Sequence, residues 1–352
     1  MEPHSQDGGG VRGISSLLIL EHLMEEIRKT KGLEHVPRPC DYFDIISGTS
    51  TGGIISIMLG RLRMTVDECI REYRDVAQKA FTPKRKSILP ASPSGVFSAT
   101  ALENAIKSTC RKFCPEEVCA ARRQQSKPRT GTCPHGEMKF RDGTCTKTVV
   151  LAITKDNVDA PPTLFTTYDT SADFRDCAIW QVARATSAAT TFFKPIGVGR
   201  DGVEFVDAGF GYNNPCEILV NEARRQFPSR TNLQVLSIGT GLGDVVDIGD
   251  TRMGIIRALK SMATSSKKVA ASMDEQYGGS DQYFRFNVEK GLEDVVLSDW
   301  EKASKISAHT KNYIQERRRA IEAFVRHFTR GVEKQEATVP ELGREIEDES
   351  KS

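Results

Sequence analysis

Residues 41–59 read DYFDIISGTSTGGIISIML, and this stretch decides the fold of the chain. The apolar run at 41–46 predicts a buried strand, and residues 54–62 predict a buried helix. Between them, Gly48-Thr49-Ser50-Thr51-Gly52 fits the pattern G-x-S-x-G. A strand, a tight turn and a helix in this order form the context of a nucleophile elbow, in which a serine stands on the turn. The stretch therefore indicates an α/β protein with Ser50 as a nucleophile.

Steric limits explain why this motif has glycine at positions 48 and 52. The elbow must push the Ser50 hydroxyl out of the sheet, and side chains at the flanking positions would collide with the strand and helix backbones. The N-terminus of the following helix also favours developing negative charge. A Gly- and Ser-rich turn with no catalytic role can have the same sequence pattern. The strand before it and the helix after it favour a nucleophile.

A second glycine-rich motif, Asp7-Gly8-Gly9-Gly10-Val11-Arg12-Gly13, stands before an amphipathic helix expected at 14–30. Consecutive glycines leave backbone N–H groups accessible to an anion, which suits an oxyanion hole for a tetrahedral intermediate. Arg12 could either fix the loop or bind a phosphate.

The same glycines also match G-x-G-x-x-G, the fingerprint of dinucleotide-binding folds. That interpretation needs a strand before the glycines and an acidic residue at the end of the next strand. Here MEPHSQ at 1–6 does not look like a strand, and the strand at 41–46 ends in Ser47. No Gly-Lys-Ser/Thr follows either, which excludes a Walker loop.

A serine nucleophile needs a base, and the histidines are poor candidates. The late ones, His309 and His327, lie in a charged segment at 299–328 that is typical of a surface helix. Asp207 is the better candidate, because it follows a short strand expected at 203–206 and precedes Ala208 and Gly209. A desolvated carboxylate can act as a base, although a lone aspartate is more often a turn residue.

The rest of the chain alternates helices with strands, which predicts an α/β fold with a largely parallel sheet. In such a sheet the strand ends converge on one edge, where Ser50 and Asp207 can meet. Further helices are expected at 65–81, 100–113, 176–187, 216–226, 251–274 and 299–328, and further strands at 148–153, 163–168 and 233–238.

Three motifs now stand in order, and together they resemble the patatin-like phospholipase family. These are D7GGGVRG13, G48TSTG52 and D207AG209, and the segments ARATSAATTFFKP at 183–195 and SIGTG at 237–241 are similar to further family stretches. The resemblance covers about residues 7–290.

This resemblance implies a three-layer α/β/α sandwich around a central, mostly parallel sheet. It implies a serine hydrolase of lipid acyl esters that works by a dyad and without a metal or other cofactor. Ser50 would be the nucleophile, Asp207 the general base, and the N–H groups of Gly8, Gly9 and Gly10 the oxyanion hole. A catalytically weak module that keeps the fold, and an esterase using His309, are the alternatives.

Family members usually have an apolar strand directly before the glycine loop, and only MEPHSQ precedes it here. We therefore expect the first strand to be missing. One domain is expected over 1–330, with a Cys- and Arg-rich surface insertion at about 114–147 and a charged, disordered tail at 331–352. Such inserts, and fusion to nucleotide-binding and repeat modules, are similar to fungal members.

Composition supports a cytoplasmic protein that can contact membranes peripherally. Of the 352 residues, 38% are hydrophobic and 27% charged, and the net charge of +2 gives no global field for nucleic acid. We expect no signal peptide, because MEPHSQDGGG at 1–10 has no basic segment followed by an apolar stretch, and no apolar run approaches a membrane span. Lys79, Lys84, Arg85 and Lys86 lie beside apolar residues and could meet an anionic lipid surface, although a solvated loop explains them equally well.

Five of the nine cysteines gather within the expected insertion or just before it, at Cys110, Cys114, Cys119, Cys133 and Cys145. A structural zinc with His135 as a further ligand is an alternative. The spacings fit no standard zinc template and contain no CxxC pair, so the sequence favours a surface loop with reduced thiols and no metal.

Overall fold

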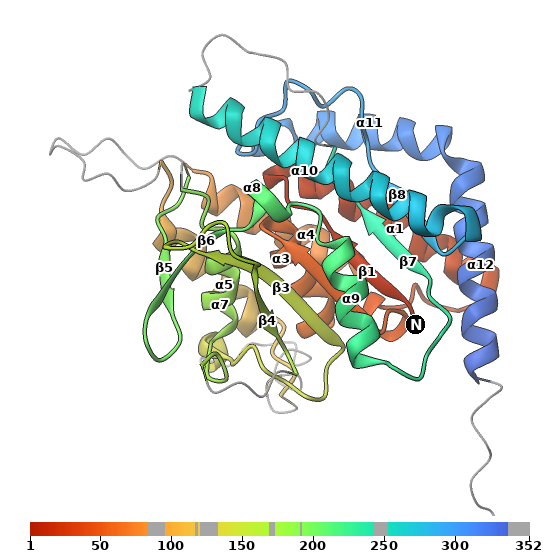
Figure 1. Cartoon of the computed structure of the whole chain (residues 1–352), viewed down its shortest axis with the longest axis horizontal. Helices are drawn as coiled ribbons and strands as arrows, with labels where there is room; N and C mark the ends of the chain where they lie inside the picture. Colours follow the sequence, from red (N-terminus) through yellow and green to blue (C-terminus); the bar gives the residue numbers. More distant parts are fainter. Residues whose placement is uncertain are drawn as a thin grey trace, which may run out of the picture.

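A computed structural model describes residues 1–82, 96–116, 119, 133–168, 173–190, 192–241 and 253–336, with only the backbone at 253–259 and 331–336. Its centre is an eight-stranded sheet of order β5-β6-β3-β2-β1-β7-β8, in which β4 also pairs with β3 (Figure 1). Five strands run parallel, namely β1 (Pro3–Gln6), β2 (Ile45–Thr49), β3 (Lys147–Thr154), β7 (Val235–Ile238) and β8 (Tyr283–Phe286).

The other three strands make the sheet mixed. Both β4 (Thr163–Thr166) and β6 (Val203–Asp207) pair with β3 in antiparallel orientation, and β5 (Ile196–Val198) pairs antiparallel with β6.

Helices cover both faces of this sheet. In Figure 1, α9 (Cys216–Gln226) and α10 (Met253–Tyr277) lie in front of it. The other helices are α1 (Gly13–Lys31), α2 (Pro39–Tyr42), α3 (Thr51–Ser56), α4 (Val66–Ala80), α5 (Ala99–Lys112), α7 (Ile179–Thr186), α8 (Gly209–Tyr212), α11 (Ala303–Glu316) and α12 (Arg318–Glu336). One π-helical turn, η2 (Ile57–Arg61), continues α3, and short 3₁₀ turns are η1 (Gly10–Arg12), η3 (His135–Glu137), η4 (Gly278–Ser280) and η5 (Trp300–Lys302).

Alternation along β3 shows how the two cores form. Val149 and Leu151 pack in one hydrophobic cluster with α9, whereas Val150 and Ala152 pack in another with α1, α3, α4 and α5. Successive side chains of a strand point to opposite faces, so a strand covered on both sides is apolar throughout. The three-layer α/β/α architecture is thereby confirmed.

The expectation that the first strand is missing is wrong. Residues Pro3–Gln6 form β1, which pairs with β2 on one side and with β7 on the other. Its polar side chains find partners inside the protein: the His4 ring stacks on Phe43 at 4.8 Å, and Gln6 Nε2 lies 2.8 Å from His4 Nε2. A central strand is held by its backbone ladder on both edges, so it does not need the apolar run that the sequence interpretation required.

Several boundaries also differ from the expectation. The strand expected at 41–46 begins only at Ile45, because Pro39–Tyr42 forms α2, and it continues through Thr49. The helix expected at 299–328 is two helices, and α12 runs to Glu336, so the first six residues of the expected tail are helical. β5, β8 and α8 were not predicted.

Some expectations concern residues outside the described ranges. These are the remainder of the tail at 337–352, the part of the predicted insertion at 117–118 and 120–132, and the basic residues Lys84, Arg85 and Lys86. Within the part that is described, no helix combines the length and the apolar character needed to cross a membrane.

Candidate active site

Ser50 stands on a strained turn between β2 and α3. Its backbone has φ 57° and ψ −125°, a region that residues other than glycine rarely occupy. The side chain is buried, with 7% of the residue exposed. The predicted strand–turn–helix context of Ser50 is therefore present, with the strain that is expected of an elbow.

Close backbone approach explains both flanking glycines. A Cβ atom at Gly48 would lie 2.0 Å from the carbonyl oxygen of Gly52. A Cβ atom at Gly52 would lie 2.3 Å from the carbonyl oxygen of Gln6 in β1. Both distances are far below van der Waals contact, so any side chain at either position would force the elbow open.

Asp207, at the end of β6, is in direct contact with Ser50. The Ser50 hydroxyl donates to Asp207 Oδ2 at 2.6 Å, and the Gly209 N–H donates to Oδ1 at 2.7 Å. Burial raises the Asp207 pKa to about 7, although both hydrogen bonds favour the charged form. A carboxyl group with this pKa changes its charge near neutral pH.

The strand β3 brings these two residues together. Thr49, the residue before Ser50, pairs with Leu151 of β3, and Asp207 pairs with the adjacent Ala152. Ser50 and Asp207 meet as expected, but the expected reason is wrong. They do not lie at the common edge of parallel strands, because β6 is antiparallel to β3. An antiparallel β6 ends at the height where the parallel β2 also ends.

Thr186, the last residue of α7, joins the elbow to the same strand. Its Oγ1 accepts the N–H of Ser50 at 2.8 Å and donates to the carbonyl of Leu151 at 2.6 Å. Thr186 lies within the stretch at 183–195 that resembles the family, but its role was not predicted.

The three predicted oxyanion glycines are not equivalent. The N–H of Gly8 donates to the carbonyl of Asn213 at 3.1 Å, so it is occupied in this structure. The N–H of Gly9 donates to Thr51 Oγ1 at 3.1 Å. The N–H of Gly10 has no hydrogen-bond acceptor among the described residues, and Gly10 borders the same pocket as Ser50.

The sequence model of the patatin-like phospholipase family matches residues 5–220, which contain the glycine loop, Ser50 and Asp207. The chain belongs to the patatin-like phospholipase family.

Relatives of known description agree with this membership. Patatin-like protein 2 of Arabidopsis thaliana is 29% identical over 268 residues, which are 67% of this chain and 59% of that protein. Calcium-independent phospholipase A2-gamma of Rattus norvegicus is 27% identical over 294 residues, 80% of this chain and 34% of that protein. A third relative, 29% identical over 254 residues, is named "Probable inactive patatin-like protein 9" of Arabidopsis thaliana. The chain thus spans 59% of the first relative and 34% of the second.

In this patatin-like chain Arg12 fixes the loop, one of its two predicted roles. Only 1% of the residue is exposed, and its guanidinium donates to the carbonyl oxygens of Val295 and Gly241, with Nε and Nη1 both at 2.8 Å. A guanidinium that is buried and bonded to these carbonyls is not accessible to a phosphate. Gly13, at the start of α1, has no room for a side chain, since a Cβ atom would lie 2.8 Å from the Tyr73 hydroxyl.

Asp7 holds the start of the loop through a partner that was not predicted. Arg285, in β8, forms a two-pronged ion pair with it, with Nη1–Oδ1 at 2.8 Å and Nη2–Oδ2 at 2.5 Å. Arg285 Nη1 also donates to Ser237 Oγ at 2.7 Å. The two residues are 278 positions apart, and no sequence pattern indicates that they interact. The contact follows only from the adjacency of β1, β7 and β8 in the sheet.

A narrow, mainly apolar pocket borders Ser50 and Asp207. Besides Ser50 and Asp207 it is lined by Phe81, Phe192, Phe193, Phe210, Met262 and Leu297. Its free volume is about 40 Å³, which is room for a few water molecules but not for an acyl chain. A lipid substrate would therefore have to displace some of these side chains.

All six histidines are described, and none lines this pocket. His309, the alternative base, is half-buried on α11, and its ring packs where a Cβ atom of Gly291 would be. His327 lies 3.5 Å from Asp281. His4 is buried within β1, and burial lowers its pKa to about 4.

Proposed function

We propose that this chain hydrolyses acyl ester bonds of lipids with Ser50 as nucleophile and Asp207 as general base. The observation that carries the proposal is the 2.6 Å hydrogen bond from the Ser50 hydroxyl to Asp207 Oδ2, made on a strained elbow beside an apolar pocket. Membership of the patatin-like phospholipase family supports a lipid ester as the substrate class.

The first half-reaction forms an acyl-enzyme. Ser50 Oγ attacks the ester carbonyl carbon while its proton moves to Asp207 Oδ2. The tetrahedral intermediate then collapses, the ester C–O bond breaks, and the proton on Asp207 passes to the leaving alcohol oxygen. The raised pKa of about 7 suits this exchange, since a carboxylate of ordinary pKa would accept the proton poorly.

The oxyanion of that intermediate needs backbone donors close to Ser50. We assign this role to the N–H groups of Gly10 and Thr51. Thr51 is the first residue of α3, so its N–H has no acceptor within the helix, and it borders the pocket. Gly9 could join them by releasing Thr51 Oγ1. Gly8 would instead shape the loop, because Thr240 Oγ1 donates to its carbonyl at 2.6 Å.

In the second half-reaction, water replaces the alcohol. Asp207 takes a proton from the water as the new C–O bond forms, and it returns this proton to Ser50 Oγ as the Ser50 Oγ–acyl bond breaks and the fatty acid leaves. The apolar side chains around Ser50 would receive the acyl chain, which supports a substrate that is drawn from a lipid surface. Transient contact with such a surface is part of this proposal.

A fluorophosphonate probe tests the nucleophile on the full chain. We expect labelling of the wild type and of Ser307→Ala, a control serine whose hydroxyl bonds only to its own helix. Ser50→Ala should show no labelling and should release no fatty acid from phospholipid–detergent micelles. Labelling of Ser50→Ala equal to that of the wild type would refute the assignment. An unlabelled wild type would favour the alternative of a catalytically weak module.

A further inference from the structure

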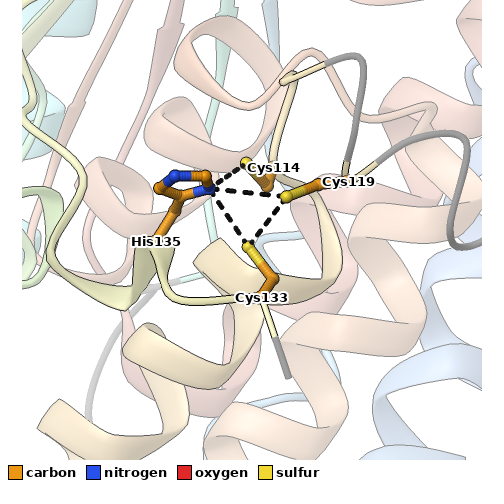
Figure 2. Close-up of side chains that lie close together, drawn as sticks. All are labelled: Cys114, Cys119, Cys133 and His135. Atoms are coloured by element: carbon orange, nitrogen blue, oxygen red, sulfur yellow. Dashed lines mark hydrogen bonds between the residues drawn. The ribbon is translucent and has the colours of Figure 1, made fainter. Parts of the chain in front are cut away.

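Four side chains of the Cys-rich insertion converge at one point beside the C-terminal end of α5. Figure 2 shows Cys114, Cys119, Cys133 and His135 pointing toward one another. Each offers one sulfur or nitrogen atom, and these four atoms all lie within 4.8 Å of one another. Cys114 and Cys119 are buried, and Cys133 and His135 are half-buried.

Four of the six distances between these atoms lie within about 0.4 Å of the edges of a tetrahedral zinc site. His135 Nδ1 lies 3.1, 3.5 and 3.3 Å from the sulfurs of Cys114, Cys119 and Cys133, and the Cys119 and Cys133 sulfurs are 3.5 Å apart. Zn–S bonds of about 2.3 Å and Zn–N bonds of about 2.0 Å place sulfurs about 3.8 Å apart and a sulfur and a nitrogen about 3.5 Å apart. A disulfide would need about 2.05 Å between its sulfurs.

The other two cysteines of the sequence cluster are elsewhere. Cys110 is fully buried in the main core with α5. Cys145 Sγ lies 3.3 Å from the carbonyl oxygens of both Asp142 and Thr146, which share its single S–H donor. The fold therefore selects three of the five cysteines and adds one histidine, which is the donor set of a Cys₃His zinc site.

We propose that Cys114, Cys119, Cys133 and His135 bind one zinc ion as a closed structural site. Three thiolates and one imidazole fill a tetrahedral shell and leave no position for water or substrate, which separates this site from the proposed hydrolytic centre. Binding releases the three thiol protons to solvent. The sequence alone favoured the opposite conclusion, because the spacings match no zinc template.

The surroundings indicate what the ion would hold. Directly after His135, the backbone of Gly136 lies against Arg111 of α5, so that a Cβ atom would be 2.7 Å from the guanidinium. Glu137 forms an ion pair with Lys107 of α5 at 2.6 Å. The Met138 carbonyl accepts the N–H of Ile179 at 2.8 Å, at the start of α7. The ion would therefore fasten the insertion to α5 and α7.

Metal analysis of the purified full chain tests the proposal. The protein is prepared in reducing buffer without chelator, and its zinc content is measured by inductively coupled plasma mass spectrometry. We expect one zinc ion per wild-type chain and less than about a tenth of that in Cys133→Ser and His135→Ala. Cys145→Ser, a cysteine of the same segment outside the four, and Ser50→Ala should both retain the full amount.

Three further readouts use the wild-type chain alone, so they do not depend on the folding of the variants. A mercurial reagent should release one zinc ion per wild-type chain, detected with a zinc-binding dye. Wild type reloaded with cobalt(II) should gain the visible absorption of tetrahedral cobalt with thiolate ligands. A strong chelator should lower the wild-type Tm by about 5 °C or more.

Three results would overturn the proposal. One is a wild type that binds less than about a tenth of an equivalent even after incubation with zinc salt under reduction. Another is loss of zinc in Cys145→Ser with retention in Cys133→Ser. The third is a disulfide between Cys119 and Cys133, found by peptide mass spectrometry in chain kept under reducing conditions.

Discussion

Ser50 Oγ and Asp207 Oδ2 lie 2.6 Å apart, although 157 residues separate them in the chain. The contact depends on β3, which pairs with β2 through Leu151 and with β6 through Ala152. Neighbouring residues of one strand therefore set the height of both side chains. The sheet thus positions the catalytic pair that we propose, with Asp207 at the end of β6 and Ser50 directly after β2, and such fixed positions are what preorganised catalysis requires.

Two substitutions of Ser50 should separate its role as nucleophile from the backbone strain at this position. Ser50→Ala and Ser50→Gly should both abolish ester hydrolysis, because both remove Oγ. Only glycine relieves the positive φ of 57°. We expect thermal unfolding of Ser50→Ala close to that of the wild type, and a Tm for Ser50→Gly about 2–4 °C above that of Ser50→Ala. Hydrolysis by either variant within tenfold of wild type would contradict the assignment, and equal Tm values would contradict the strain.

The second prediction concerns the base. Asp207→Asn keeps the size and removes the basicity, and it should lower kcat by roughly 100-fold or more. In the wild type, kcat/KM should increase as pH rises toward about 7 and then level off, because the ionised carboxylate is the active form. Steady-state rates from pH 5 to 9 measure both. A near-wild-type kcat for Asp207→Asn over this range would show that the base is another group.

The same substitution should stabilise the fold in a pH-dependent way. Between the ordinary pKa of 3.8 and the raised value of about 7, the folded chain keeps a proton on Asp207 that the unfolded chain has released. The contribution of Asp207 to stability therefore falls as pH rises through this window. Asp207→Asn lacks this loss, so its Tm should exceed that of the wild type at pH 8 and approach it toward pH 5. Parallel Tm curves for the two proteins from pH 5 to 9 would argue against a raised pKa.

Local patterns explain what the sequence predicted well. The elbow requires glycine at positions 48 and 52 and a serine between them, and all of these lie within five consecutive residues. Helix α9, with the bounds Cys216–Gln226, was predicted with its boundaries, and α5 within one residue. In each case a short window holds the apolar period and the residues that end it.

What escaped prediction depends on neighbours that are distant in sequence. β1 carries His4, Ser5 and Gln6, which look exposed, yet its backbone is paired on both sides. The antiparallel direction of β6 leaves no local mark, so the right pair of residues was found for a partly wrong reason. The Cys₃His cluster forms only because the chain returns to α5 at residues 133–135, a path that no spacing template describes.

Histidine should be dispensable for hydrolysis. His309→Ala removes the alternative base, but the His309 ring on α11 packs against Gly291 and does not line the Ser50 pocket. We expect kcat within about threefold of wild type, against the 100-fold or greater loss that removal of a true base causes. Steady-state hydrolysis at pH 8 measures it. A loss of several orders of magnitude in a variant with unchanged Tm would make His309 the base.

The final prediction concerns the buried ion pair between Asp7 and Arg285. Their side chains are 3% and 15% exposed, so each alone would be a poorly solvated charge. Asp7→Asn and Arg285→Met should each cost about 3–5 kcal/mol in the free energy of unfolding, since each leaves one partner unpaired. The double variant should lose clearly less than the sum, because no unpaired charge remains.

Urea unfolding of the four proteins gives this coupling, and Lys155→Met provides a control. Lys155 forms a pair with Glu204 of similar length, 2.6 Å, but with side chains 46% and 47% exposed. Loss of this exposed pair should lower the free energy of unfolding by about 1 kcal/mol or less, because water screens the two charges. The single variants at the buried pair should also lower kcat, because Asp7 directly precedes the loop that carries Gly10. Additive losses at Asp7 and Arg285, or equal losses at the buried and exposed pairs, would show that this ion pair does not hold the loop.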